Sequence, residues 1–370
     1  MNIAKVLVIH PSLGLGGAEK IIAFVANSLS DDYNVTLLTL KRSKKTLELS
    51  EAVEEDYIDC YSESPIVGSN IVPGIKALLH MSRQIKEYIL SKHFDLIICF
   101  DLRVLLAVYL SGINKHVKVL FSERADPYEN PRYWAALLKH IYKRINYVVF
   151  QTEGAREFYG NSIFAKSNII LNPAFARIGF TDKRDWSNIN NVIFAAGRFQ
   201  KRKGFDLLID AFSQIAKKYN DVQLIIYGEG EEKDNLKMQI ITYNLQNRVE
   251  LRDPINGVVE HNINSRMFVL PSRSEGIPNI VIEAMYYGIP CVISDCRPGG
   301  ARLLSNNGEY CILAENDNAN SIAESIEYAL GNEKAIKQMA ILAKESLKRF
   351  DENKIRLEWI HTVSRVLEGK

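Results

Sequence analysis

The stretch KVLVIHPSLGLGG, Lys5–Gly17, is the part of the sequence that indicates the fold. Its first six residues form a short apolar run, which is typical of a buried strand, and glycines follow directly. Apolar residues then recur at helical spacing over Glu19–Ser30, and a second apolar run occupies Val35–Leu40. A strand, a helix and a second strand in this order form a βαβ unit. The unit predicts a parallel sheet with right-handed crossovers.

The same alternation continues along the chain in two series. In the first series we expect further strands at Asp95–Phe100, Val117–Phe121 and Tyr147–Gln151. A polar stretch over residues 171–191 predicts a linker. Strands of the second series are expected at Asn191–Ala196, Val222–Gly228, Met267–Leu270, Pro290–Ser294 and Tyr310–Leu313. The sequence therefore predicts an α/β fold of two doubly wound, Rossmann-like domains that face each other across a cleft.

Length and charge agree with this architecture. A chain of 370 residues corresponds to two domains at roughly 150 residues each. We expect an amino-terminal domain over residues 1–175 and a carboxyl-terminal domain over residues 176–350. The net charge of +2 excludes a globally basic protein, so no nucleic-acid partner is expected.

The five cysteines and the hydropathy of the chain predict a cytoplasmic protein. The cysteines are odd in number and have no zinc-ribbon spacing, which favours reduced thiols. No apolar run approaches the roughly 20 residues of a membrane-spanning helix. The apolar run Val6–Ile9 is too short for a signal peptide. Any membrane contact is therefore expected to be peripheral, on the inner face of the plasma membrane.

The glycines of the first loop are Gly14, Gly16 and Gly17. Glycines after a first strand let the backbone approach a phosphate, and the following helix start favours anions. A tight turn without a ligand fits this pattern equally well. A dinucleotide fingerprint would need Gly or Ala at position 19, where this chain has Glu19, so a dehydrogenase is disfavoured.

Two further segments follow predicted strands and carry charge. Gly197–Gly204 contains four Lys and Arg residues, which can neutralise adjacent phosphates, although a solvated basic loop is the alternative. Pro271–Met285 contains Glu275 and Glu283, with seven residues between them. The backbone amides at the intervening helix start can donate to phosphate or sugar oxygens, and a carboxylate in the helix can accept ribose hydroxyls.

These motifs together resemble a known enzyme family. Glu275-Gly276-Ile277-Pro278 followed by Glu283 resembles the E-x7-E signature of retaining GT-B glycosyltransferases, in particular glycosyltransferase family 4 of bacterial polysaccharide assembly. Gly197-Arg198 with Lys203-Gly204 is similar to the family's diphosphate-binding pair. Gly16-Gly17-Ala18-Glu19 and Gly228-Glu229-Gly230 resemble two of its loops. The resemblance covers most of the chain in the family's order.

The resemblance implies a hexosyltransferase and a role for each matched residue. The donor would be a nucleotide sugar, with UDP favoured, and a hexose or N-acetylhexosamine would move with retention of configuration. Arg198 and Lys203 would hold the diphosphate and stabilise the leaving group, and Glu275 would lie beside the transferred sugar. Glu283 would hold the ribose. The remaining donor contacts are assigned to Gly16, Gly17, Arg252, Gly276, Ile277, Pro278, Asn279 and Ile280.

The family resemblance also implies an acceptor site and a returning helix in the first domain. Residues 122–127, SERADP, resemble a family segment with the pattern S-E-R-N-D-P, and Glu123, Arg124 and Asp126 are candidates for acceptor binding. Many family members have a cleft histidine here, and this chain has none. The last helix, 351–370, is expected to cross back onto the first domain. The acceptor would be a glycan or a polyprenyl-diphosphate-linked oligosaccharide in polysaccharide, O-antigen or glycoconjugate assembly.

Residues 64–150 carry twelve Lys and Arg against six Asp and Glu. Within them, the segment Arg132–Arg144 combines four of these cations with aromatic and aliphatic residues. Such a helix can lie on an anionic membrane surface, and a helix packed on the sheet with a solvated basic face is the alternative.

No two aspartates stand two positions apart, so the Asp-x-Asp motif with which the other glycosyltransferase architecture holds a metal is missing. We expect no metal and no cofactor, because Arg198, Lys203 and helix-start amides can neutralise the leaving diphosphate. Two alternatives remain, namely a nucleotide-sugar epimerase of the same fold and a non-catalytic sugar-nucleotide-binding subunit.

Overall fold

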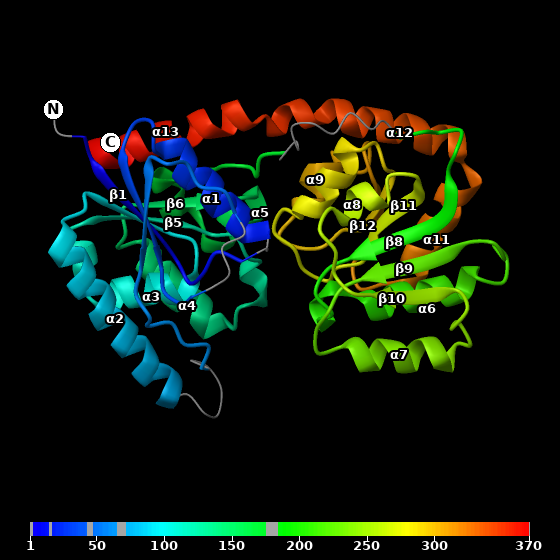
Figure 1. Cartoon of the computed structure of the whole chain (residues 1–370), viewed down its shortest axis with the longest axis horizontal. Helices are drawn as coiled ribbons and strands as arrows, with labels where there is room; N and C mark the ends of the chain where they lie inside the picture. Colours follow the sequence, from blue (N-terminus) through cyan, green and yellow to red (C-terminus); the bar gives the residue numbers. More distant parts are fainter. Residues whose placement is uncertain (1–2, 15–16, 43–46, 65–71, 175–183, 370) are drawn as a thin grey trace. The chain divides into compact units, whose positions relative to one another are not determined.

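The computed structural model divides the chain into two compact units (Figure 1). Unit 1 consists of Met1–Pro173 and Glu352–Lys370, and unit 2 of Ala174–Asp351. Each unit is built on a parallel sheet flanked by helices, so the predicted fold class is confirmed. The residues that the structure describes are 3–14, 17–42, 47–64, 72–174 and 184–369.

In its described part, unit 1 contains a seven-stranded sheet with the order β3-β2-β1-β4-β5-β6-β7, and all neighbouring strands are parallel. The strands are β1 (Lys5–His10), β2 (Asn34–Thr39), β3 (Val53–Tyr57), β4 (Leu96–Cys99), β5 (Lys118–Ser122), β6 (Tyr147–Phe150) and β7 (Ser167–Ile169). The central strands are buried from end to end because helices cover both faces of the sheet, which explains their continuous apolar runs.

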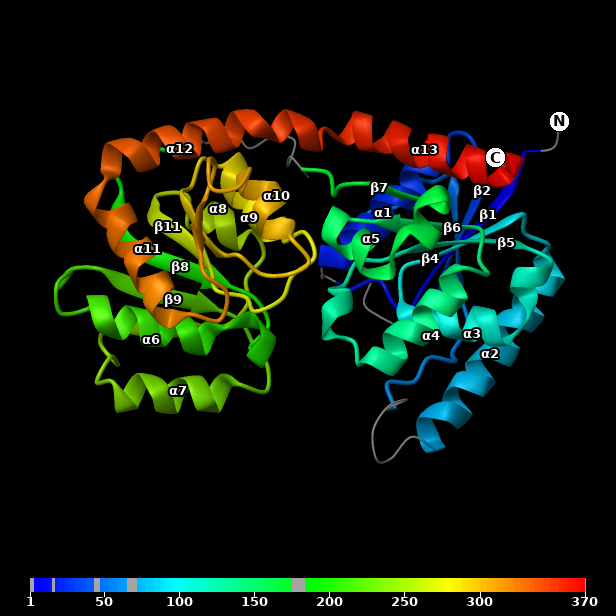
Figure 2. The ribbon, with the colours of Figure 1, turned by 180° about the vertical axis from the view of Figure 1, so that it is seen from behind.

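The helices of unit 1 are α1 (Gly17–Leu29), α2 (Val72–Lys92), α3 (Leu102–Leu110), α4 (Arg132–Tyr142), α5 (Glu153–Tyr159) and α13 (Glu352–Glu368), with 3-10 turns η1 (Ile113–Lys115), η2 (Pro127–Glu129) and η3 (Asn161–Lys166). Helices α2, α3, α4 and α5 pack on one core. Figure 2 shows α13 across the sheet from α3 and α4. Helix α13 belongs to unit 1 because it packs against α1 and β5, and its Trp359 is fully buried beside Phe100.

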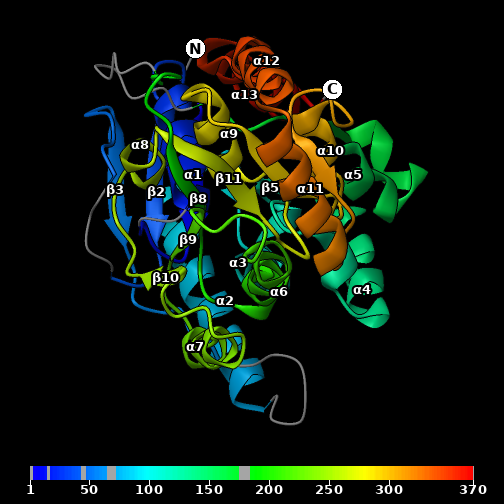
Figure 3. The same cartoon turned by 90° about the vertical axis from the view of Figure 1, so that its right-hand side faces the viewer.

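Unit 2 repeats the arrangement with a six-stranded parallel sheet of order β10-β9-β8-β11-β12-β13 over the residues described. The strands are β8 (Asn190–Ala196), β9 (Gln223–Tyr227), β10 (Val249–Arg252), β11 (Ser265–Leu270), β12 (Cys291–Ser294) and β13 (Ile312–Ala314). Its helices and 3-10 turns are η4 (Lys201–Lys203), α6 (Phe205–Ile215), α7 (Lys233–Thr242), α8 (Val258–His261), α9 (Asn279–Tyr286), α10 (Gly300–Ser305), α11 (Ala319–Gly331), α12 (Glu333–Ser346) and η5 (Leu347–Phe350). Figure 3 shows α6 and α11 on one side of this sheet, and α8 and α9 on the other.

The strand order of unit 2 reverses direction at β8. The chain proceeds from β8 outward to β9 and β10, then returns to the other side of β8 to form β11, β12 and β13. In such sheets the loops that leave the two strands at the reversal diverge to opposite faces, and ligands bind in the crevice outside their carboxyl ends. The segments that follow β8 and β11, residues 197–204 and 271–278, are the two charged segments that the sequence analysis selected.

Candidate active site

The loop after β8 is held by backbone bonds to the next strand end. The amide of Gly197 donates to the carbonyl of Tyr227 at 3.0 Å, and the amide of Phe199 donates to the carbonyl of Glu229 at 2.7 Å. Phe199 is fully buried, and a Cβ on Gly228 would lie 2.0 Å from the Gly197 carbonyl oxygen. Only glycine therefore allows this approach of the two strand ends, which explains the glycine of the Gly228-Glu229-Gly230 turn.

Gly204 brings the same loop against the loop after β11. Its φ is +68°, and a Cβ would lie 2.0 Å from the carbonyl oxygen of Pro271. Both the left-handed backbone and the contact require glycine. The turn η4 directly before Gly204 therefore lies close to the start of the β11–α9 loop, and it brings Lys203 with it.

Lys203 and Glu275 form an ion pair across the two loops. Their side chains are only 15% and 11% exposed, and the Ser272 hydroxyl donates to the same Glu275 oxygen at 2.8 Å. The structure thus brings together two of the three residues predicted as catalytic. A partly dehydrated cation and carboxylate at the carboxyl ends of the two strands provide a strong local field, because screening by water is reduced there.

Arg198 differs from Lys203 in its surroundings. Its side chain is exposed and makes no hydrogen bond or ion pair with any residue that the structure describes. A guanidinium presents a planar fork of donors that fits phosphate oxygens. Arg198 therefore lies at the end of β8 with its donors available to an anion.

The loop from Gly276 to Pro278 leads directly into α9. A Cβ on Gly300, the first residue of α10, would lie 1.7 Å from the Gly276 carbonyl oxygen, so the two backbones are in contact. Asn279 and Ile280 form the first turn of α9, and Glu283 lies in its second turn with a partly exposed side chain. Of the predicted donors, Pro278 has no N–H and cannot give a hydrogen bond. Gly276, Ile277, Asn279 and Ile280 retain theirs.

Arg252 ends the edge strand β10, two strands away from β8. Its guanidinium donates to Glu250 at 2.6 Å and to the Tyr227 hydroxyl at 3.2 Å. The hydrogen bond from Arg252 lowers the pKa of Glu250. Arg252 and Arg198 therefore both lie at the carboxyl ends of their strands, and Arg252 has a carboxylate partner of its own.

The residues predicted to bind an acceptor have internal partners in unit 1. Glu123 is buried and accepts hydrogen bonds from the hydroxyls of Tyr142 and Tyr159, and burial raises the pKa of its carboxyl. Asp126 is buried and accepts from the amide of Tyr128 at 2.9 Å, which caps η2. Both carboxylates therefore form hydrogen bonds inside unit 1.

Arg124 is enclosed by the returning helix. Its guanidinium lies 5.6 Å from the ring of Trp359 and donates to Ser122 and Asn172 at 2.8 and 2.7 Å. Its Nη2 atom is buried without a hydrogen-bond partner, and desolvation lowers the pKa of Arg124 to about 9. Acceptor binding by Glu123, Arg124 and Asp126 stays a prediction.

The amino-terminal glycine loop is described only in part. Gly16 lies outside the described residues, and Gly17 begins α1. His10 ends β1, and its Nδ1 lies 2.8 Å from the Ser12 carbonyl oxygen. The sequence analysis missed Ser272, Arg273 and Asp206, all of which contact this site or its supporting loops. Of these three, only Arg273 has a signal in the sequence, because it stands two residues before Glu275 in a charged loop.

Within the described residues, no three His, Cys, Asp or Glu side chains gather in a way that could hold a metal ion. None of the helices that the structure describes is both long and apolar enough to cross a membrane.

Comparison with protein families and curated proteins gives related enzymes. Residues 180–349 match the family described as glycosyl transferases group 1. An uncharacterized glycosyltransferase of Haemophilus influenzae is 26% identical over 93% of this chain and 95% of its own length. A Campylobacter jejuni protein named GalNAc-alpha-(1->4)-GalNAc-alpha-(1->3)-diNAcBac-PP-undecaprenol alpha-1,4-N-acetyl-D-galactosaminyltransferase is 21% identical over 98% of this chain and 99% of its own.

Solved structures agree with the observed fold. Sucrose-phosphate synthase from Thermosynechococcus elongatus has a TM-score of 0.81 at 17% identity and covers 99% of this chain and 100% of its own. HepE of Anabaena in complex with UDP-glucose has a TM-score of 0.76 at 18% identity and covers 97% and 99%. The chain therefore has the GT-B fold, and its carboxyl-terminal part carries a glycosyl transferases group 1 domain.

Proposed function

We propose that the protein is a retaining glycosyltransferase of family 4 that transfers a hexose or N-acetylhexosamine from a nucleotide sugar. The observation that carries the proposal is the Lys203–Glu275 pair at the point where the unit 2 strand order reverses. The Arg198 side chain in the same β8 loop has no partner among the residues that the structure describes. The group 1 domain match over 180–349 supports this assignment because it covers every one of these residues. UDP is the favoured nucleotide, supported by the bound UDP-glucose in HepE.

Lys203 and Arg198 neutralise the charge that develops on the leaving diphosphate. The Lys203 ammonium has three N–H donors, so it can keep the carboxylate of Glu275 and still donate to a phosphate oxygen. Preorganised donors of this kind replace a metal, because they meet the charge without having to reorganise. Transfer is therefore independent of metal ions in this proposal.

The remaining donor contacts follow from the loops around these cations. Glu275 lies beside the transferred sugar, and Glu283 accepts the ribose hydroxyls from the second turn of α9. The amides of Gly276, Ile277, Asn279 and Ile280 donate to sugar and phosphate oxygens. Gly16 and Gly17 of the first glycine loop are assigned to the donor phosphates by the family resemblance alone, and Arg252 to the base.

The acceptor is a glycan or a polyprenyl-diphosphate-linked oligosaccharide in bacterial polysaccharide or glycoconjugate assembly. The name of the Campylobacter relative, which acts on an undecaprenyl-diphosphate glycan, supports this class. Two exposed helices of unit 1 support a peripheral contact with an anionic membrane surface, which would bring a cytoplasmic enzyme to such an acceptor.

Helix α4 contributes less apolar surface to that contact than its sequence predicts. Leu138, Ile141 and Tyr142 are buried against the sheet, while Tyr133 and Leu137 are exposed at 62% and 39%. Its cations lie on the remaining surface.

Helix α2 adds a longer exposed apolar face. Val72, Ile75 and Leu79 are 59%, 43% and 54% exposed, and the exposed Lys76 and Lys86 lie on the same side by helical spacing. Apolar residues flanked by lysines on one helix face favour an anionic lipid surface.

The stereochemical course of the reaction tests the proposal. A UDP-sugar and an acceptor glycan are incubated with the full chain, and the anomeric configuration of the first-formed product is read by proton NMR. We expect release of UDP and a new glycosidic bond with the donor's configuration. An inverted product would contradict the retaining assignment, and UDP-sugar interconversion without transfer would identify an epimerase.

A further inference from the structure

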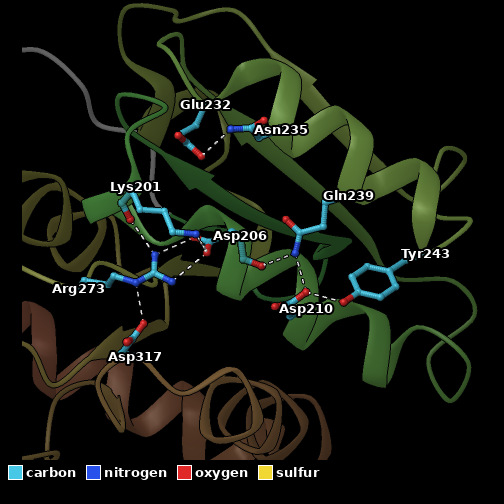
Figure 4. Close-up of polar contacts among 9 residues, drawn as sticks. All are labelled: Lys201, Asp206, Asp210, Glu232, Asn235, Gln239, Tyr243, Arg273 and Asp317. Carbon is cyan, nitrogen blue, oxygen red and sulfur yellow. Dashed lines mark hydrogen bonds and ion pairs between the residues drawn. The ribbon is translucent and has the colours of Figure 1, made fainter.

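Arg273 ties the loop that carries Glu275 to the loop that carries Lys203 (Figure 4). Its amide donates to the carbonyl of Arg202 at 2.8 Å, and its Nη1 donates to the carbonyl of Lys201 at 2.7 Å. Its own position is two residues before Glu275 in the loop after β11. One residue of the second loop is therefore bound to two consecutive carbonyls of the turn that ends in Lys203.

Asp206 completes this tie from the first turn of α6. Nη1 and Nη2 of Arg273 donate to its two carboxylate oxygens at 2.7 and 2.8 Å, and the Lys201 ammonium lies 2.6 Å from one of them. Burial alone would raise the pKa of Asp206, but the hydrogen bonds from Arg273 and Lys201 outweigh it and lower the pKa. Asp206 is therefore an anion at neutral pH.

This pair differs from an ordinary surface ion pair. Exposed pairs contribute little because water and salt screen them, whereas bidentate contacts between Arg and a carboxylate are stronger and fix a geometry. The side chains of Arg273 and Asp206 are only 22% and 20% exposed. Arg273 also donates through Nε to Asp317 at 2.6 Å, a residue that is itself 62% exposed.

Asp210 provides an internal comparison one turn further along α6 (Figure 4). Its carboxylate accepts from Gln239 at 2.5 Å and from the Tyr243 hydroxyl at 2.8 Å. The same helix thus holds two aspartates with two side-chain partners each. The partners of Asp210 come from α7 and its C-cap, and those of Asp206 come from the two loops of the candidate active site.

We propose that Arg273 and Asp206 are positioning residues, which fix the distance between Lys203 and Glu275 and so hold the ammonium where the leaving diphosphate develops charge. The inference rests on the proposed function, because it assigns Lys203 that task. Neither residue is proposed to touch the substrate. A shift of about 1 Å in a catalytic group can cost roughly a hundredfold in rate, so loosening the tie is expected to lower turnover.

The test compares Asp206→Asn with Asp210→Asn in the full-length chain. Each change removes one negative charge from α6 and keeps the side-chain size. We expect both variants to lose a similar amount of thermal stability. Only Asp206→Asn should lower kcat, by about ten- to a hundredfold, with the donor KM changed by less than about threefold. Arg273→Lys keeps the charge and loses the bidentate contact, so it should fall between wild type and Asp206→Asn.

The outcomes separate this inference from the function on which it rests. Equal kcat for Asp206→Asn and Asp210→Asn, with wild-type turnover intact, would overturn the positioning role and leave the proposed function standing. A wild-type chain that turns over no nucleotide sugar would overturn both. If Asp206→Asn does not fold, Arg273→Lys carries the same comparison, and wild-type kinetics in that variant would count against the role.

Discussion

The two units share one strand order over six strands, to which unit 1 adds β7, but the charges at their strand ends have different surroundings. In each unit the first strand lies between the second and the fourth, so each sheet has one reversal point. In unit 1, Glu123 and Arg124 after β5 bind tyrosines, Ser122, Asn172 and the face of Trp359. In unit 2, the side chain of Arg198 has no partner among the described residues, and Lys203 pairs with Glu275.

The topology determines where the loops lie, and the side chains determine whether those loops can bind a ligand. Parallel sheets of this order place loops at the same edge whatever the sequence is. Charged side chains that are buried with internal partners contribute to stability. Charged side chains at the carboxyl ends of the strands that keep unused hydrogen-bond donors can bind a ligand. Changes at the strand ends of unit 1 should therefore alter stability, and changes at the strand ends of unit 2 should alter turnover.

Lys203→Ala gives the largest expected effect. If Lys203 stabilises the leaving diphosphate as an oxyanion donor would, its removal should lower kcat by about 10²–10³. The thermal midpoint should fall as well, because Glu275 is only 11% exposed and loses its cation, so kcat is compared at a temperature at which both proteins are folded. Steady-state kinetics with a UDP-sugar measure the first quantity and a thermal melt the second. Wild-type kinetics in this variant would contradict the expectation that residues at the strand ends of unit 2 determine turnover.

The exposed apolar residues of α2 in unit 1 are expected to bind membranes, and those of α7 in unit 2 are not. Ile75→Ser with Leu79→Ser removes two exposed apolar side chains of α2, and full burial of each is worth about 1.5–3 kcal/mol. We expect flotation with phosphatidylglycerol vesicles at low salt to weaken at least about tenfold. The matched control replaces Met238 and Ile241 of α7, which are 63% and 50% exposed, and should float as wild type does. Equal flotation of both double variants would remove α2 from the membrane contact.

Gly204 of unit 2 and Gly14 of unit 1 lie in corresponding loops and should differ in how well they tolerate alanine. Gly204→Ala forces a Cβ to within 2.0 Å of the Pro271 carbonyl and places alanine at a φ of +68°, so it should destabilise unit 2 by about 1–3 kcal/mol or more. Gly14→Ala should be tolerated, because its nearest contact would be the flexible Glu19 carboxylate at 3.7 Å. Denaturant titrations of both variants test this. Equal stabilities would show that the two loops are packed alike.

Glu123→Gln should change the pH dependence of stability. Burial raises the pKa of Glu123 above its ordinary value of 4.5. The folded chain therefore holds this proton while the unfolded chain loses it, and the stabilisation present below pH 4.5 is lost as the pH rises through the folded pKa. Glutamine does not ionise, so the thermal midpoint of wild type should fall relative to that of the variant as the pH rises above 4.5 and through the folded pKa. If the thermal midpoints of the two proteins change with pH in parallel, Glu123 is not a buried carboxyl with a raised pKa.

Chelation is expected to have the smallest effect. If Arg198 and Lys203 replace a metal, turnover in excess EDTA should match turnover without it. Loss of most activity, restored by magnesium, would show that a cation shares the task.

The sequence predicted every central strand and one edge strand, β13, but not the other edge strands. The unpredicted strands are β3, β7 and β10, and each lies at an edge of its sheet. Val53–Tyr57, VEEDY, has acidic residues at most positions, because an edge strand is only partly covered and charge there discourages further pairing. Apolar runs therefore identified the covered strands and missed edge strands that lack such a run.

The candidate site was predictable where chemistry follows local spacing. Lys203 and Glu275 were selected from motifs, and the structure pairs them. Asp206 was missed because an acidic residue in a first helical turn already suits the helix dipole, so nothing local indicates a second task. The buried contacts of Glu123 were not predicted, because the two tyrosines that enclose it lie 19 and 36 positions further along the chain. The acceptor role assigned to Glu123 from the family resemblance stays a prediction.

Nucleotide binding to unit 2 is the central claim, and a thermal-shift panel tests it most directly, since it needs no acceptor. The wild-type chain is melted with UDP-, GDP- and ADP-sugars and with the free diphosphates, alongside Lys203→Ala and Glu123→Gln. A ligand at a hundredfold excess over its dissociation constant stabilises the folded state by about 2.7 kcal/mol. We predict that UDP-sugars raise the midpoint of wild type and Glu123→Gln and raise that of Lys203→Ala much less. No shift with any nucleotide, or an undiminished shift in Lys203→Ala, would contradict the account.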